Sequence, residues 1–310
     1  MHNKLPVNSE GWLAFELNVL RRLKFETAAL SSGGETKLGA HLKRWNARVQ
    51  TNDLTQADWT KAFAEIENNE SILAGDNMYI ALEDAYIPRH RLQNPVLRNW
   101  FGESDAWWLD NVRQNVEKIS SPQAKAVALK IGMAVGDYAL SFSERTRELR
   151  QPLSKVFERI CSIEPPPFNN NQKNSCANKP LNDFVAETYT DLMFLRLPPP
   201  YRLPLREAYG WTAWREEWIR GNADFWNEME TAQAGKLGSR VDSKTQYLQL
   251  VENILQTASH VPQWAIAYVE DGFAATQEIV ETINRVRHVE TIFTKDFSEL
   301  TGTKAVIITA

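Results

Sequence analysis

The residues best suited to chemistry by type and spacing are Pro198, Pro199, Pro200 and Tyr201, which end an apolar run that starts at Asp191. The run is short, holds one charge in its interior and is bounded by chain breakers, which predicts a buried central strand. Because proline cannot continue a sheet ladder, the chain must leave the sheet near Pro198. We expect the ring of Tyr201 to lie at the sheet edge, where open α/β sheets bind their ligands. An ordinary strand followed by a Pro-rich loop is the alternative interpretation.

A second candidate group surrounds a glycine pair near the N-terminus. The pattern is a strand over 25–30, a turn with Gly33 and Gly34, a helix over 38–45, a strand over 47–51, and then Asp53. It outlines a nucleotide-type βαβ unit, in which glycines let the backbone approach a ligand and the acidic residue accepts from a ribose hydroxyl. The turn lacks the Gly-Lys-Ser/Thr ending of a Walker phosphate loop.

The composition is that of a globular protein, with 43% apolar and 24% charged residues among 310. A net charge of −4 argues against a general polyanion binder, although it is compatible with a local basic face. Two cysteines and five scattered histidines predict a reducing compartment and no structural metal. No apolar run is long enough to span a bilayer, and residues 1–6 lack the apolar core of a signal peptide. We therefore expect a cytoplasmic protein with no membrane partner.

Helix and strand patterns divide the chain into four segments. Residues 1–80 and 184–310 alternate helices and strands and are predicted to form the two parts of one α/β domain. Between them, 81–163 has no convincing strand and predicts an inserted helical subdomain. The Pro/Asn-rich segment 164–183 is predicted to be a loop. Strong helix patterns lie at 105–119 and 122–142, and further helices are predicted over 56–73, 144–160 and 243–259.

Two further sets of side chains are candidates for binding. The predicted helical segment is rich in arginine, which predicts a basic DNA-binding face or, alternatively, a solvated helix surface. The arginines are Arg89, Arg91, Arg145, Arg147 and Arg150. Trp211, Trp214 and Trp218 follow the Pro-rich turn, and because tryptophan favours interfaces, we expect them to contact a partner. Packing inside the protein is the alternative interpretation for tryptophan.

Taken in order, these features resemble the adenine-specific DNA methyltransferases of the Dam-like, or D12, class. In that family a cofactor motif precedes an inserted target-recognition region, and the catalytic motif follows it. Pro199-Pro200-Tyr201 match the last three residues of the catalytic motif, which begins with Asp or Asn. Leu42-Lys43 and Asn52-Asp53 match residues after the cofactor loop, and Gly34 matches a glycine of that loop. The resemblance implies a Rossmann-like methyltransferase mixed sheet flanked by helices, with S-adenosylmethionine as cofactor and DNA as substrate.

Two positions depart from the family pattern. Pro198 stands where the family has the residue that accepts a hydrogen bond from the exocyclic amino group, and proline has no side-chain acceptor. Thr36 falls on the second glycine of the cofactor loop and adds a Cβ there. Tyr201 keeps a ring on which a flipped base can stack. Pro198 to Tyr201 are thus a degenerate catalytic motif, and Gly33, Gly34, Thr36 and Asp53 a degenerate cofactor site.

These departures predict a pseudoenzyme that needs no cofactor. Its expected role is that of a DNA-binding or partner-binding subunit in a restriction-modification or phage-defence assembly, with an active methyltransferase or another defence subunit as partner. Three alternatives stay open. They are an active S-adenosylmethionine-dependent adenine methyltransferase with a variant motif, a purely structural subunit, and an unrelated α/β protein in which Pro-Pro-Tyr is chance.

Overall fold

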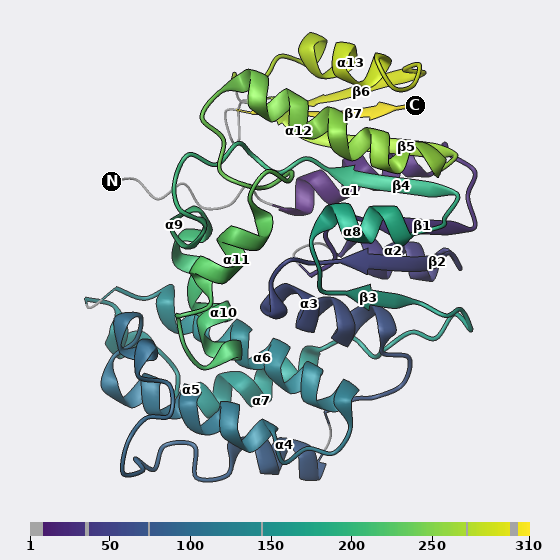
Figure 1. Ribbon diagram of the computed structural model, residues 1–310. Coiled ribbons are helices and arrows are strands. Elements are labelled where there is room, and N and C mark those ends of the chain that lie inside the picture. The colour runs from purple at the N-terminus through teal and green to yellow at the C-terminus, as the bar shows by residue number, and fades with distance from the viewer. Residues whose placement is uncertain (1–8, 35–36, 74, 144, 271, 298–302) are drawn as a thin grey trace.

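The computed structural model describes residues 9–34, 37–73, 75–143, 145–270, 272–297 and 303–310, and in it the strands form one seven-stranded mixed sheet (Figure 1). The expectations that rest on residues 1–6 and on Thr36 lie outside these described residues. The strands are β1 Thr27–Leu30, β2 Arg48–Asn52, β3 Ser175–Ala177, β4 Leu192–Arg196, β5 Gln263–Glu270, β6 Thr291–Asp296 and β7 Lys304–Thr309.

The strand order is β3-β2-β1-β4-β5-β7-β6, and β7 is the single reversed strand. β1 lies between β2 and β4 and is parallel to both. The order of the strands therefore switches direction between β1 and β4, and their carboxyl ends meet at one edge of the sheet. Open α/β sheets bind ligands at such a switch point. The fold is α/β with a mixed sheet flanked by helices, and it is compatible with a Rossmann-like fold.

The apolar run before the prolines is β4, in the centre of the sheet. Leu192, Met193, Phe194 and Leu195 are each at most 2% exposed. Leu192 and Phe194 pack toward α1 (Ser9–Leu20) and α2 (Leu38–Arg44) on one face of the sheet, whereas Met193 and Leu195 pack toward the other. A parallel strand covered on both faces needs apolar residues at every position, which explains why the run does not alternate.

Helices cover both faces of the sheet. The face opposite α1 and α2 packs against α8 and α12, with α13 nearby (Figure 1). Their bounds are α8 Leu181–Glu187, α12 Lys244–Thr257 and α13 Thr276–Asn284, with the short 3₁₀ turn η5 Ala258–His260 after α12. Within the described residues, no helix combines the length and the apolar character needed to cross a bilayer.

The remaining helices form a helical layer beside the β3 edge of the sheet (Figure 1). Its first part comprises α3 Gln56–Ala62, the π-helical turn η1 Phe63–Glu67, α4 Gly75–Leu82, η2 Pro95–Asn99, α5 Glu103–Val116, α6 Pro122–Leu140, η3 Arg147–Leu149 and α7 Leu153–Ile163. Its second part comprises α9 Leu205–Tyr209, η4 Gly210–Thr212, α10 Ala213–Arg220 and α11 Trp226–Gln233. Because α3 and α10 share one hydrophobic cluster with the helices of 81–163, that segment has no separate core of its own.

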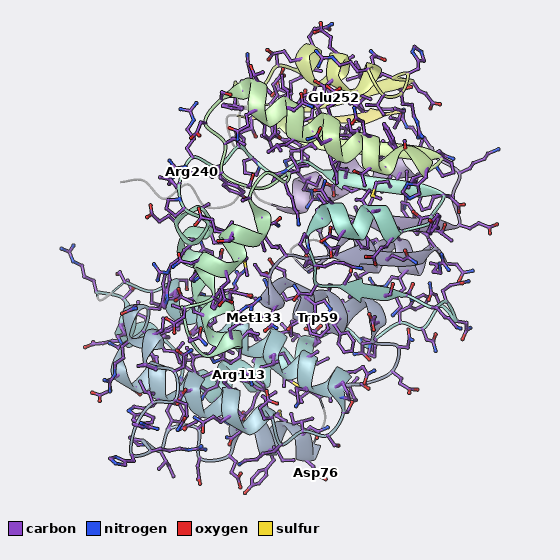
Figure 2. The ribbon with its side chains drawn as sticks, viewed as in Figure 1. Trp59, Asp76, Arg113, Met133, Arg240 and Glu252 are labelled. Atoms are coloured by element: carbon purple, nitrogen blue, oxygen red, sulfur yellow. The ribbon has the colours of Figure 1, made fainter. Side chains whose placement is uncertain are left out.

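Two tryptophans of α10 pack into the centre of the helical layer. Trp214 and Trp218 are fully buried, and they lie against Gly136 and Gly132 of α6. A Cβ at Gly136 would come within 2.1 Å of the Trp214 ring, so only glycine fits there. Figure 2 shows the neighbouring Met133 of α6 inside the same layer. Trp214 and Trp218 are thus internal, and the expectation that they face a partner is wrong for both. The third tryptophan of that expectation, Trp211, is half-buried and lies under the guanidinium of Arg215.

Three predicted segments differ from the structure. The helix expected over 56–73 ends at Glu67, because Asn68 turns the chain: its Oδ1 accepts a hydrogen bond from Ser71 N at 2.8 Å. The helix expected over 144–160 begins only after Pro152, since the residue before a proline disfavours helical angles. The loop expected over 164–183 contains β3, which adds to the edge of β2.

Candidate functional site

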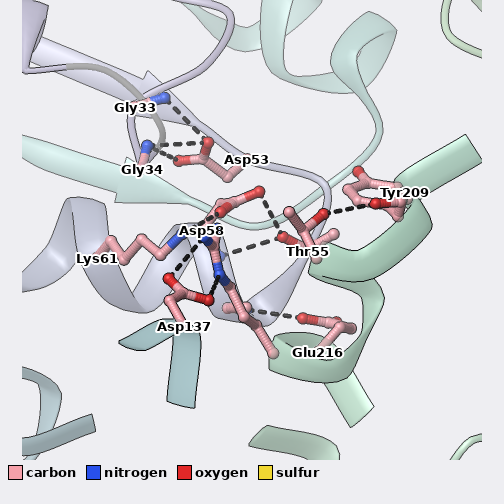
Figure 3. Close-up of polar contacts among 12 residues, drawn as sticks. Gly33, Gly34, Asp53, Thr55, Asp58, Lys61, Asp137, Tyr209 and Glu216 are labelled. Carbon is pink, nitrogen blue, oxygen red and sulfur yellow. Dashed lines mark hydrogen bonds and ion pairs between the residues drawn. The ribbon is translucent and has the colours of Figure 1, made fainter. Parts of the chain in front are cut away.

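The glycine pair and Asp53 lie together at the carboxyl edge of the sheet, as the βαβ pattern predicted. Asp53 follows β2, and its Oδ1 accepts hydrogen bonds from Gly33 N at 2.9 Å and from Gly34 N at 3.1 Å (Figure 3). Its Oδ2 accepts a second bond from Gly34 N at 3.2 Å. The carboxylate is only 5% exposed. Asp53 therefore binds the glycine loop of its own chain.

Packing explains why both loop residues are glycines. A Cβ on Gly34 would come within 2.0 Å of the Asp58 carbonyl oxygen, and one on Gly33 within 2.8 Å of the Thr51 Cβ. The loop therefore lies directly on the end of β2 and the first turn of α3. Such close packing needs glycine at both positions whether or not a ligand is present.

The first turn of α3 adds a second carboxylate, that of Asp58. Thr55 is the N-cap of α3, and its Oγ1 accepts from Asp58 N at 3.1 Å while donating to Asp58 Oδ2 at 2.9 Å. Lys61 Nζ donates to Asp58 Oδ1 at 3.1 Å. Burial raises the pKa of Asp53 to about 7, and the nearby Asp58 carboxylate adds to this rise in pKa.

The residues of the Pro-rich turn make backbone contacts. The carbonyl oxygen of Pro198 accepts a hydrogen bond from the Tyr247 hydroxyl at 2.9 Å, and that of Tyr201 accepts from Val241 N at 2.9 Å. Tyr201 also forms a β-bridge with Arg240. A cavity beside the Tyr201 side chain has a volume of about 10 Å³, which holds about one water molecule and no base.

Two tyrosines join the two carboxylates in what we call the acid–tyrosine cluster: Asp53, Asp58, Tyr201 and Tyr209. Burial raises the pKa of both tyrosine hydroxyls, and the Asp58 carboxylate raises both pKa values further. Strongly shifted groups at a sheet edge are a signature of functional sites, although internal networks produce them too. The cation beside this cluster, Lys61, is paired with Asp58, so among the described residues the cluster offers no unpaired positive charge to a phosphate group.

Two buried glutamates that no sequence pattern predicted lie near this edge, one on α1 and one on α10. Glu16 of α1 is 0% exposed and pairs with Arg196, the last residue of β4. Burial raises the pKa of Glu16, and the Arg196 guanidinium opposes that rise in pKa. From α10, Glu216 accepts hydrogen bonds from Gln56 N at 2.9 Å and Ala57 N at 2.7 Å at the start of α3 (Figure 3). No local pattern predicts these bonds, because Glu216 is about 160 residues from its partners.

The predicted DNA-binding arginines have different environments. Arg150 forms two hydrogen bonds of 2.7 Å with the Asp105 carboxylate, and Arg147 lies 3.5 Å from the same group. Arg89 donates to the side chains of Gln114 and Asn115. Arg91 and Arg145 are exposed and have no ion pair with any described residue. The set therefore divides into Arg150, which is used inside the protein, and four exposed side chains.

The described part of the site does not fit S-adenosylmethionine. The cofactor needs an acidic residue whose oxygens face outward to its ribose hydroxyls, but the Asp53 oxygens face the loop N–H groups and are almost fully covered. Pro198 offers no side-chain acceptor to a substrate amino group. Among the described residues, no group of three or more metal-ligating side chains lies together.

No model of a protein family matches this chain, and no curated protein does so either.

Proposed function

We propose that this chain is a methyltransferase-like protein without catalytic activity, which acts by binding DNA or a protein partner in a restriction-modification or phage-defence assembly. The main support is the turn after β4, where the Pro198 carbonyl is bonded to Tyr247 and no acidic or amide side chain is present. Amino methylation needs an acceptor for the exocyclic amino group at this position. The loss of one positioned polar group typically lowers the rate by about two to three orders of magnitude.

The arrangement of the strands is in line with the methyltransferase part of this proposal. The resemblance implied a mixed Rossmann-like sheet, and the sheet has one reversed strand, β7, between β5 and β6. The glycine pair after β1 and the Pro-rich turn after β4 lie at the same edge, because β1 and β4 are parallel neighbours. Both motifs thus have the relative position that the family pattern requires.

The exposed arginines support DNA as the ligand. Tyr86 is 44% exposed and lines a shallow cavity together with Arg147, next to the loop that carries Arg89 and Arg91. Cations beside an exposed aromatic ring suit a phosphate backbone and its bases. Because the one cation beside the acid–tyrosine cluster, Lys61, is already paired with Asp58, we place DNA on the helical layer and away from the sheet edge.

Loss of catalysis predicts that purified protein neither binds S-adenosylmethionine nor transfers its methyl group. In calorimetry we expect no saturable heat at ligand concentrations up to about 1 mM, a limit that corresponds to about −4 kcal/mol of binding free energy. A radiolabelled-methyl assay on adenine-containing duplex DNA should stay at background, with an active adenine methyltransferase as the positive control. Tight cofactor binding together with methyl transfer would contradict the proposal.

DNA binding through the helical layer predicts a loss of affinity when two exposed arginines change sign. For the Arg91→Glu, Arg145→Glu variant we expect about a tenfold weaker Kd for duplex DNA, and a salt dependence lower by roughly one unit of slope per lost phosphate contact. The matched control is Lys24→Glu, Lys295→Glu, which reverses two exposed cations outside the helical layer. Fluorescence anisotropy at several salt concentrations measures the Kd and its salt dependence for each variant. Equal affinity of the two variants would remove DNA from the proposal and leave the protein partner.

A further inference from the structure

A cavity of about 730 Å³ lies between α2 and the helical layer, away from the acid–tyrosine cluster. Its walls come from α2, η1, α6, the end of α7 and the Pro-rich segment 164–168. Small-molecule sites in proteins typically have volumes of about 300–1,000 Å³. This cavity is therefore large enough for a compact organic ligand.

One wall of the cavity is cationic. Lys37, His41 and Arg44 are spaced at i, i+4 and i+7, so they lie on one face of α2, and all three line the cavity. None of them forms an ion pair with another described residue. Burial lowers the pKa of His41, and the neighbouring Arg44, Lys37 and Arg21 lower this pKa further, which indicates a positive local potential.

The acidic side chains of the cavity share one cation. Glu65 and Glu164 both line it, and both accept from Lys130 Nζ, at 2.6 Å and 2.5 Å. These three side chains together have one net negative charge, whereas Lys37 and Arg44 contribute two positive charges, so the lining as a whole is positive and suits an anion from outside the protein.

A buried lysine adds a polar group to this wall. Lys43 is 1% exposed, and its Nζ donates one hydrogen bond, to the Asn68 carbonyl oxygen at 2.7 Å. An ammonium group has three N–H donors, so two are left without a partner among the described residues. Burial lowers the pKa of Lys43 to about 8, because the charged form is desolvated; an anion beside it would oppose that effect.

Apolar side chains from the helical layer and from the Pro-rich segment also line the cavity. They include Leu73, Val127, Ile131 and Phe168. We propose that this cavity binds a small organic anion, a phosphate or carboxylate group on an apolar or aromatic body, with the anionic group on α2 and the body against the helical layer. This site does not depend on the proposed methyltransferase-like role.

The test uses one apolar body with different head groups. In calorimetric titrations of the full chain, we expect 1-naphthyl phosphate or 1-naphthylacetate to bind at least about tenfold more tightly than uncharged 1-naphthol. Inorganic phosphate alone should bind more weakly than the better naphthyl anion. The stronger of the two anions tells whether the site favours phosphate or carboxylate. Equal binding of 1-naphthol, or no binding of either anion at 1 mM, would overturn the proposal.

Two variants and one thiol locate the bound anion. Arg44→Glu reverses an exposed cation at the cavity, and Ala40→Trp fills the cavity from the surface of α2; each should weaken binding about tenfold or more. Lys295→Glu, which reverses an exposed cation outside the cavity, is the matched control and should bind as the parent protein does. Cys161 lines the cavity and is half-buried, so saturating ligand should slow its alkylation by iodoacetamide, measured by mass spectrometry. If neither variant weakens binding and Cys161 is unprotected, the anion binds elsewhere and the proposal is wrong.

Discussion

We expect the free energy of unfolding of the parent protein to fall as the pH rises from about 4 to about 7, and we expect Asp53→Asn to abolish this decrease. Burial and the Asp58 carboxylate raise the pKa of Asp53 to about 7 in the folded chain, whereas an aspartate in the unfolded chain titrates near pH 3.9. Between these values the unfolded chain has released the proton and the folded chain still holds it. The folded state is therefore favoured at low pH, and this contribution falls as the pH rises, until it levels off above about pH 7.

Asparagine suits this test because it keeps the two shorter hydrogen bonds of the loop. Both glycine N–H groups donate to Asp53 Oδ1, and the asparagine carbonyl oxygen can take that position; only the longer contact from Gly34 N to Oδ2 is lost. One unit of pKa is worth about 1.4 kcal/mol, so above pH 7 we expect the variant to be on the order of 2–4 kcal/mol more stable than the parent.

Urea denaturation at pH 4.5, 6 and 8 measures this difference in the free energy of unfolding. Asp242→Asn, at an exposed position, is the matched control and should follow the parent protein at every pH. A variant that keeps the parent's dependence on pH would mean that Asp53 is already ionised in the folded protein. In that case its carboxylate would have the charge state that a ribose-binding residue needs.

The sheet was largely predictable, because its strands have strong local signals. β4 and β5 are continuous apolar runs, and parallel strands that are covered on both faces require such runs. The strand, glycine turn, helix, strand and acidic residue at 25–53 also form in the predicted order. In contrast, β3 has three residues and only partly buried side chains, and it forms because the β2 edge is available. A short edge strand of this kind leaves almost no pattern in the sequence.

The positions of the site residues were predictable, but their directions were not. Asp53 and the glycine pair do meet at the sheet edge, yet the carboxylate bonds to the loop N–H groups and is almost fully covered. Spacing along a chain indicates which residues can meet, and it does not indicate how a side chain turns. The tryptophans of α10 illustrate a similar limit. A cluster of tryptophans fits a partner surface and an internal contact equally well. Here the contact is internal, because Gly132 and Gly136 of α6 leave room for the two indole rings.

Glu217 of α10 makes a second buried contact of the helical layer that no local pattern predicted. It is 0% exposed, and its carboxylate accepts from Trp100 Nε1 at 2.6 Å, from Trp226 Nε1 at 3.0 Å and from Arg206 Nε at 2.6 Å. These donors come from the residue directly after η2, from α11 and from α9, so one side chain connects three segments to α10. A buried carboxylate is stable only when such donors surround it.

We expect Glu217→Gln to lower the free energy of unfolding by about 3 kcal/mol or more, although the two side chains have nearly the same shape. Glutamine has one acceptor oxygen, so its NH₂ group must face at least one of the three donors, and the Arg206 cation loses its counter-ion. Urea denaturation followed by tryptophan fluorescence measures the loss, since Trp100 and Trp226 report directly on the contact. The matched control is the exposed Glu228→Gln, for which we expect a change within about 0.5 kcal/mol. A loss below about 1 kcal/mol at Glu217 would mean that water or a rearranged Arg206 satisfies the indole donors, and that the helical layer is held by its apolar contacts alone.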